Sequence, residues 1–240
     1  MKFSPPLEPG LLVKRYKRFL ADVQLDSGEL ITAHCPNTGS MLGCDAPGSR
    51  VWLSHSNNPK RKTAYSWELV EVAPDILVGI HTGRANGLVA LAIQTGLIAS
   101  LQGYGIVRSE VSYGAENSRI DFLLQQGNQP DAYVEVKSVT AICGTDAQQN
   151  VMAIFPDAVS ARGTKHLREL MQMVRAGKRA VLCFCVQRSD ARCVRAAQEI
   201  DPLYARTLRE AVEAGVEVIA YRASVTPEQL RLVAAVPVVV

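Results

Sequence analysis

The first third of the chain alternates short apolar runs with polar turns. Two apolar runs in "FLADVQLDSGELITAHC" flank Asp26-Ser27-Gly28, which is a hairpin signal. The runs "SRVWLSHS", "YSWELVEVA" and "DILVGIHT" continue the pattern, and a basic turn over residues 57–62 separates the first two. Several short strands with turn residues between them predict a small β-barrel or sandwich.

Helical periodicity begins after His81–Arg84. Leu88, Leu91, Ala92 and Thr95 recur at helical spacing. Two more helices are predicted over 164–176 and from Pro202, and a glycine follows each of them. The strand-like runs around these helices are "GIVRSEVSY", "RIDFLLQ", "AYVEVKSV", "RAVLCFCVQ" and "VEVIAYRASV", the last of which is expected to close the order. The pattern predicts an α/β protein of two domains, residues 1–82 and residues 83–240.

Composition narrows the class of protein only a little. Apolar residues make up 48% of the 240 residues and charged residues 20%, as in ordinary globular proteins. The net charge of +3 neither requires nor excludes nucleic acid. No apolar run approaches the roughly 18 residues of a membrane helix, and prolines interrupt the start of the chain, so we expect a cytoplasmic protein. The six cysteines match no zinc spacing and are expected to be free core thiols.

Three charged residues stand inside apolar strands. Glu135 and Lys137 are two positions apart, so they project to the same face of their strand. The turn-rich stretch "QQGNQPD" predicts that this strand lies antiparallel to the one that carries Asp121, with Ile120, Phe122 and Leu124 together on the opposite face. Asp121 and Glu135 would then lie side by side.

Two neighbouring carboxylates repel each other unless a divalent cation bridges them. Lys137 would add a compact positive charge for a phosphate or a water molecule. The predicted catalytic residues are therefore Asp121, Glu135 and Lys137, and the first two are predicted metal ligands. A third acidic ligand is expected on or after the preceding strand, either Glu110, which we favour, or Glu116. The alternative is an ordinary solvated strand face.

An acid followed by acid-x-Lys on the next strand resembles the PD-(D/E)XK nuclease superfamily. The predicted order of helix, three strands, helix and strand is also similar to the core of that superfamily. The resemblance implies that the acids hold Mg²⁺ or Mn²⁺, which polarises the scissile phosphate, and that the lysine supports the charge of the transition state. Ile120 stands where the superfamily commonly has proline.

Basic residues gather in three places and are candidate phosphate contacts, which would not read the DNA sequence. They are Lys14, Arg15, Lys17 and Arg18 before the first expected strand, Lys60, Arg61 and Lys62 in a hairpin turn, and Arg162, Lys165 and His166 at the start of the 164–176 helix. Solvated surface charge is the alternative for each cluster.

Aromatic residues accompany these clusters, and they either stack on bases or fill the barrel core. They are Tyr16, Phe19, Tyr65 and Trp67. The polar stretch "HCPNTGSM" contains Asn37, Thr38 and Gly39, which form either a plain turn or a loop that presents donors to DNA or to the metal site.

Taken together, several stretches resemble the sugar fermentation stimulation protein A family of bacteria. They are "RYKRFLADV", "HCPNTGSM", "VWLSHS", "KRKTAYSWELV", "SRIDFLL", "YVEVKSVT" and "FPDAVSARGTKHLREL", and the resemblance extends from Phe3 to Pro237. It implies an OB-fold-like first domain, a PD-(D/E)XK-like second domain, DNA binding without marked sequence preference, and a role in regulating sugar (maltose) metabolism. The stretch "AICGTDAQQNVMAI" departs from the family, whose members often have a loop there, so the sequence leaves its course open.

Three functions remain open at this point. The first is a DNA-binding regulator that keeps a nuclease fold, and the second is an active Mg²⁺- or Mn²⁺-dependent DNA endonuclease. The third, a sugar-handling enzyme, has no site in the sequence. Because no Walker A, Gly-x-Gly-x-x-Gly or Gly-x-Ser-x-Gly motif occurs, we expect no nucleotide cofactor and no serine hydrolase chemistry.

Overall fold

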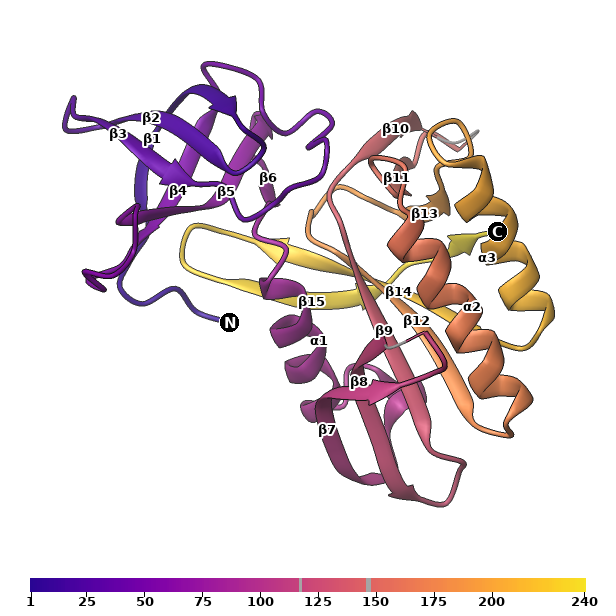
Figure 1. Ribbon diagram of the computed structural model, residues 1–240. Coiled ribbons are helices and arrows are strands. Elements are labelled where there is room, and N and C mark those ends of the chain that lie inside the picture. The colour runs from indigo at the N-terminus through magenta and orange to yellow at the C-terminus, as the bar shows by residue number, and fades with distance from the viewer. Residues whose placement is uncertain (117, 146–147) are drawn as a thin grey trace.

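The alternating strands of the first part of the chain close into a β-barrel (Figure 1). The computed structural model describes residues 1–116, 118–145 and 148–240. The strands of this part are β1 (Glu8–Tyr16), β2 (Leu20–Leu25), β3 (Leu30–His34), β4 (Arg50–His55), β5 (Tyr65–Ala73) and β6 (Ile76–Gly79). Their order is β3-β2-β1-β4-β5-β6, and β3 also pairs with β5, so β1 to β5 form a closed ring without free edges.

Inward-facing residues of these strands fill the barrel. Val23, Val51, Leu53 and Trp67 are fully buried in one apolar cluster. Trp67 therefore belongs to the core, and its indole N–H donates to the Leu69 carbonyl at 2.8 Å. Of the four aromatic residues proposed as stacking groups, Phe19 is the most exposed, with 46% of the residue accessible to solvent.

The second part of the chain combines three α-helices with a large mixed sheet. Its elements are α1 (Arg84–Gln94), a 3₁₀ turn (Ala99–Leu101), β7 (Tyr104–Tyr113), β8 (Ser118–Gly127), β9 (Ala132–Val139), β10 (Ile142–Thr145), β11 (Val151–Phe155), α2 (Ala161–Arg175), β12 (Arg179–Val186), β13 (Cys193–Ala196), α3 (Pro202–Glu213), β14 (Glu217–Val225), β15 (Leu230–Ala235) and β16 (Val238–Val239). The large sheet has the order β15-β14-β12-β9-β8-β7.

Helices cover both faces of this sheet (Figure 1). α1 packs on one face, where Leu88 and Val89 join Phe122, Val134 and Val136 in one apolar cluster. α2 and α3 pack on the other face and complete a second cluster. β9, β12 and β14 run parallel to one another, whereas β8 is antiparallel to β9. The prediction that the strands of Asp121 and Glu135 are antiparallel neighbours is confirmed.

The stretch 141–154, whose course the sequence leaves open, contains β10 and β11 among its described residues, and these two strands pair with each other; residues 146 and 147 lie outside the described residues. One sequence prediction about the second part of the chain is wrong. The run 217–225 does not close the order, because β15 and β16 follow it. β10, β11, β13 and β16 form a small sheet of their own beside the large one.

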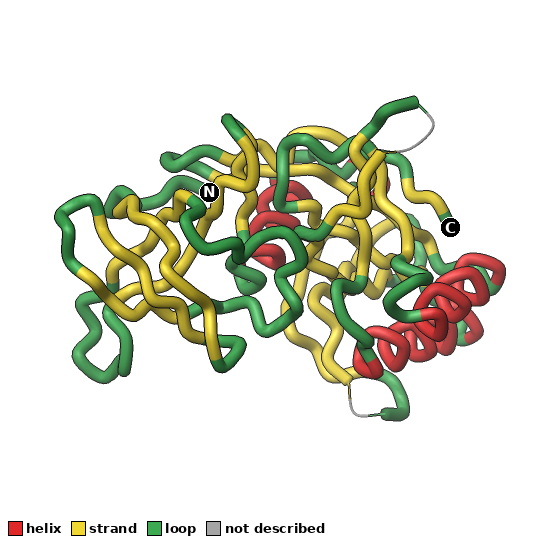
Figure 2. Tube along the Cα trace, turned by 90° about the horizontal axis from the view of Figure 1, so that it is seen from above, coloured by secondary structure: helices red, strands yellow, loops and turns green. Residues whose placement is uncertain are grey.

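The barrel lies beside the second part of the chain (Figure 2), and main-chain hydrogen bonds join the two. The Gly79 amide donates to the Gln187 carbonyl at 2.8 Å, which ties β6 to the end of β12. The N-terminal segment also crosses to the second part, where the Phe3 amide donates to the Glu228 carbonyl at 2.9 Å. No helix among the described residues has the length and apolar character that crossing a membrane would require.

Candidate functional site

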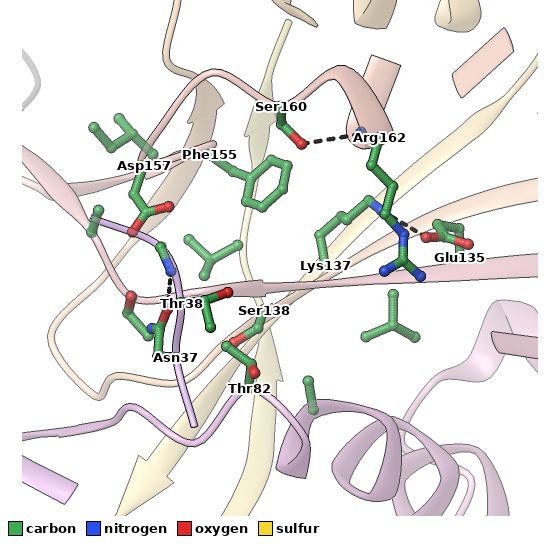
Figure 3. A pocket seen from close by; sticks show the side chains of 18 of the residues that line it. Asn37, Thr38, Thr82, Glu135, Lys137, Ser138, Phe155, Asp157, Ser160 and Arg162 are labelled. Atoms are coloured by element: carbon green, nitrogen blue, oxygen red, sulfur yellow. Dashed lines mark hydrogen bonds and ion pairs between the residues drawn. The ribbon is translucent and has the colours of Figure 1, made fainter. Parts of the chain in front are cut away.

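A cavity of about 320 Å³ lies where the barrel meets the mixed sheet (Figure 3). The barrel contributes the loop 37–39, and the start of α1 contributes Asn86. β8 and β9 contribute Asp121, Glu135 and Lys137, and the segment before α2 and its first turn complete the wall. The three residues predicted to be catalytic therefore line one cavity.

Asp121 lies where β8 and β9 stop pairing. The observed pairs end at Phe122 and Val134, and continuing this register by one residue places Asp121 opposite Glu135. Beyond Phe122 the Asp121 carboxylate, rather than a backbone carbonyl of β8, accepts the Val136 N–H at 2.7 Å. The same carboxylate accepts the Asn86 side-chain amide at 2.7 Å. Burial and the negative charge of Glu135 raise the pKa of Asp121 above its ordinary value.

Glu135 is almost completely buried, with only 3% of the residue exposed. Its Oε1 accepts from Lys137 Nζ at 2.6 Å and also contacts Nδ1 of His166. Its Oε2 is buried and has no hydrogen-bond partner within the described part of the chain. Burial favours the neutral acid, but the His166 hydrogen bond and the Lys137 charge outweigh it, so the pKa of Glu135 lies below its ordinary value.

His166 connects α2 to this pair of charges. Its Nδ1 lies 3.2 Å from Lys137 Nζ, and its Nε2 accepts from Arg162 Nε at 3.3 Å. His166 is buried, whereas Arg162 is exposed at the rim of the cavity. The sequence predicts a DNA contact at His166, but in the structure this side chain contacts the Glu135 carboxylate.

The regular alternation of faces along β8 breaks at Asp121. Phe122 and Leu124 pack in the cluster on the α1 side, but Ile120 packs in the cluster on the α2 and α3 side. The expectation that all three share one face is therefore wrong. This irregularity lets the Asp121 side chain reach the Val136 N–H and Asn86 on α1.

Neither candidate for a third acidic ligand lines the cavity. Glu110 is exposed on β7 and has a positive φ of 55°. Glu116 is also exposed and pairs with Arg168 at 3.1 Å. Across the described ranges, no group of three or more His, Cys, Asp or Glu side chains is arranged to hold a metal ion. The acidic groups at the cavity are Asp121, Glu135 and, at its other end, Asp157.

The first basic cluster does not precede the first strand, as the sequence suggested. Lys14 and Arg15 lie inside β1, and Lys17 and Arg18 form the turn to β2 with positive φ values of 50° and 66°. Lys14, Lys17 and Arg18 are exposed. Arg15 is not, because its guanidinium donates to the carbonyl oxygens of Asn37 and Gly39 at 3.1 and 2.8 Å and its side chain is only 10% exposed.

The other two basic clusters differ in how accessible they are. Lys60, Arg61 and Lys62 are exposed in the connection between β4 and β5, and Arg61 donates to the Ser66 hydroxyl at 2.6 Å. At α2, Lys165 is half-buried and donates to the Glu116 carbonyl.

Sequence reasoning missed several polar residues that line the cavity. They are Asn86, Thr82, Asp157 and Ser160. The Asp157 carboxylate accepts the Met41 N–H at 2.9 Å, and its carbonyl accepts the Ser40 hydroxyl at 2.6 Å. Isolated polar residues next to turns carry no sequence signal for such long-range contacts. One of the two sequence interpretations of Asn37, Thr38 and Gly39 is a loop that faces the metal site across the domain interface. These three residues do line the cavity, on its barrel side.

None of the six cysteines, which all lie in the described part of the chain, forms a disulfide, and all except Cys143 are buried. Burial raises the pKa of the Cys44 thiol to about 11, which keeps it protonated at neutral pH. The five buried thiols therefore pack as small apolar residues, as the sequence predicts, whereas the prediction of a core position is wrong for the exposed Cys143.

Comparisons with known proteins agree with this architecture. The family model described as "SfsA N-terminal OB domain" matches residues 13–80, and that described as "Sugar fermentation stimulation protein RE domain" matches residues 83–229. The chain is 56% identical over 239 residues to the "Sugar fermentation stimulation protein homolog" of Geobacter metallireducens, covering 100% of both chains. It is 53% identical over 238 residues to the protein of the same description from Shewanella sp. strain MR-4, covering 99% of each.

A solved structure is similar over the whole molecule. The structure of Pyrococcus furiosus SfsA in complex with Ca²⁺ superimposes with a TM-score of 0.86 at 28% sequence identity, covering 100% of this chain and 98% of that one. The prediction of an OB-fold barrel followed by an α/β domain is confirmed. The chain belongs to the sugar fermentation stimulation protein family.

Proposed function

We propose that this protein binds DNA through its phosphates and hydrolyses phosphodiester bonds at a divalent-cation site formed by Asp121, Glu135 and Lys137, in the service of sugar (maltose) metabolism. One observation carries the proposal. Two carboxylates and a lysine from adjacent strands line one polar cavity, and the buried Glu135 has an oxygen without a partner among the described residues. The second candidate is a regulator that binds DNA at the same surface and does not cleave it.

The residues at the cavity fit a divalent cation. An unpartnered buried carboxylate oxygen costs about 1–3 kcal/mol, and a cation would satisfy it. Mg²⁺ commonly uses one or two carboxylates, several water molecules and the phosphates of the substrate. Asp121 and Glu135 would provide the two carboxylates. The related Pyrococcus furiosus protein was solved in complex with Ca²⁺, which supports a site for a hard cation in this family.

When bound, such a cation supplies Lewis-acid polarisation of the phosphate. The chain's own groups do the rest. Lys137 brings an ammonium group with 11% side-chain exposure, which is positioned to offset negative charge on a phosphate in the cavity. His166 holds the Glu135 carboxylate through Oε1, so Oε2 is left for the cation. Arg162, exposed at the rim, adds a second positive group for the DNA backbone.

DNA binding is supported by charge on the exposed turns of the barrel. Lys17, Lys60 and Lys62 are exposed in these turns, Lys14 is exposed near the end of β1, and OB-fold barrels commonly bind oligonucleotides. Phosphate contacts from such lysines carry no sequence information. The proposed binding is therefore independent of sequence.

A cleavage assay tests the proposal. Purified protein is incubated with plasmid and single-stranded DNA in the presence of Mg²⁺, of Mn²⁺ or of a chelator. We expect metal-dependent cleavage that is lost in Asp121→Ala and Lys137→Ala but kept in the matched controls Asp131→Ala and Lys178→Ala. The two control residues form an ion pair of 3.2 Å with each other, and neither lines the cavity. DNA that is bound but intact under every metal condition would favour the regulator.

A further inference from the structure

We infer that DNA reaches this site as an unpaired nucleotide, so the substrate is single-stranded DNA rather than intact duplex. The inference rests on the proposed phosphodiesterase function and names its substrate class. It follows from the shape of the cavity and from the side chains at the end away from Lys137.

The cavity has two chemically different ends (Figure 3). Glu135, Lys137 and Arg162 lie at one end, which suits a phosphate. Asn37 and Asp157 lie at the other end, and Phe155 lies between the two. A nucleotide has the same order of parts, because its phosphate and its base are joined through the sugar.

The barrel side of the cavity is a fixed wall. Arg15 donates to the carbonyl oxygens of Asn37 and Gly39, and Arg18 Nε donates to that of Thr38 at 2.9 Å. From the other side, Asp157 accepts the Met41 N–H at 2.9 Å. Because arginines on the barrel side and Asp157 on the other side hydrogen-bond to the backbone of residues 37–41, the 37–39 loop keeps its position and DNA must fit the cavity beside it.

The size of the cavity excludes a base pair within its stack. Its volume of about 320 Å³ lies at the lower end of the range for small-ligand sites, which is roughly 300–1,000 Å³. A paired base brings its partner and its stacked neighbours with it. A base that enters this cavity must therefore leave its stack, and single-stranded DNA makes this least costly.

The end away from Lys137 offers groups that suit a base. Asn37 is buried and its Oδ1 accepts the Gly39 N–H at 2.9 Å, while its Nδ2 has no hydrogen-bond partner among residues that the structure describes. Asp157 uses Oδ2 for Met41, and its Oδ1 likewise has no partner in the described ranges. An amide donor beside a carboxylate acceptor suits the polar edge of a base.

Phe155 provides an apolar surface between the two ends. Its ring packs against Phe184 and Tyr204 with centroid distances of 5.7 and 5.2 Å, which fixes its position. The ring is half-buried and lines the cavity. Base–aromatic contact of this kind tolerates any base, in keeping with binding that does not depend on sequence.

Equilibrium binding separates this inference from the proposed function. The affinity for a fluorescent twelve-nucleotide DNA strand is measured by anisotropy in Ca²⁺, alone and annealed to its complement. We expect the single strand to bind at least tenfold more tightly than the duplex. Asn37→Ala should weaken single-strand binding about tenfold and leave duplex binding within twofold, whereas the control Asn128→Ala, exposed in the β8–β9 connection, should change neither. Equal affinities, or an Asn37→Ala variant that binds both forms normally, would overturn the inference.

A second measurement compares cleavage of the single strand with cleavage of relaxed, covalently closed duplex DNA in Mn²⁺. Equal rates would overturn the inference and leave the phosphodiesterase function standing. Absence of any cleavage, together with tighter single-strand binding that depends on Asn37, would overturn the phosphodiesterase function and support the unpaired nucleotide in the cavity. The two failures are therefore distinguishable.

Discussion

At the scale of single residues, the arrangement around Glu135 contributes little to stability. Lys137 and His166 both contact Oε1, while Oε2 stays buried without a partner in the described residues. A buried ion pair is weak evidence for stability, because removing charges from water offsets most of their attraction. Local arrangements that are unfavourable for folding are typical of functional sites. The cost at Glu135 therefore agrees with a site that a cation completes.

Asp121→Asn tests the electrostatics of the site. The pKa of Asp121 is raised by burial and by Glu135, so its ionised form destabilises the folded protein once the pH rises above its unfolded pKa. Without metal, we expect the variant to be as stable as the parent or more stable by about 1 kcal/mol at pH 7, a difference that disappears as the pH falls toward about 4.

The same variant should lose the rise in melting temperature that Mn²⁺ produces in the parent protein. Urea unfolding at several pH values, followed by thermal melts with and without Mn²⁺, measures both effects. Asp131→Asn is the matched control and should keep its response to Mn²⁺. A variant of Asp121 that still gains stability from Mn²⁺ would contradict its assignment as a metal ligand.

Lys137→Ala separates metal binding from catalysis. Removing the ammonium group deletes positive charge that would support the transition state, so we expect cleavage to fall at least about 100-fold. Mn²⁺ should bind as well as before or more tightly, because Glu135 Oε1 loses a competing cation at 2.6 Å. Calorimetric titration of Mn²⁺ beside the cleavage assay checks this. Weaker Mn²⁺ binding would show that the lysine acts through the carboxylates instead.

At the scale of elements, what the sequence predicts depends on how local the contact is. The two-residue spacing of Glu135 and Lys137 on β9 predicts their shared face, because strand geometry alone sets it. The contact of His166 with Glu135 joins α2 to β9 across 31 positions of sequence, and no local pattern reveals it. Asn86 reaches Asp121 from α1 in the same way. The positions of His166 and Asn86 in the site are thus fixed by packing between elements.

The role of Arg15 shows the same limit. Its charge is visible in the sequence, but its partners are not. The loop that follows β3 presents carbonyl oxygens that need donors, and Arg15 supplies them at Asn37 and Gly39. The sequence therefore predicts one role, phosphate contact, for the whole basic cluster, whereas the structure shows Arg15 anchoring the loop.

Arg15→Ala and Lys14→Ala test these two roles on neighbouring residues of β1. Arg15→Ala should lower the free energy of unfolding by about 2 kcal/mol, because several partly buried carbonyl oxygens lose a charged donor. Lys14, with 63% side-chain exposure and an ion pair to Asp22 at 3.5 Å, should change stability by less than about 1 kcal/mol. Chemical denaturation of both variants decides the matter, and equal losses would contradict the loop-anchoring role.

At the scale of the whole molecule, the net charge of +3 is too small to attract DNA without local concentration. In the proposed function, the exposed basic turns of the barrel provide this local concentration of positive charge. The cavity lies where the barrel meets the sheet. The barrel thus has two functions in this proposal: it holds the DNA backbone and it supplies one wall of the site.

The salt dependence of DNA affinity tests whether these turns act locally. Each phosphate contact with single-stranded DNA contributes about 0.7 to the slope of log K against log salt. The double variant Lys60→Ala/Lys62→Ala should therefore lower the slope by about 1.4. The control Arg175→Ala/Lys178→Ala removes the same charge at the end of α2 and the turn after it, and it should leave the slope unchanged. Equal reductions in both variants would mean that DNA responds to total charge alone, and the barrel would then have no special part in binding.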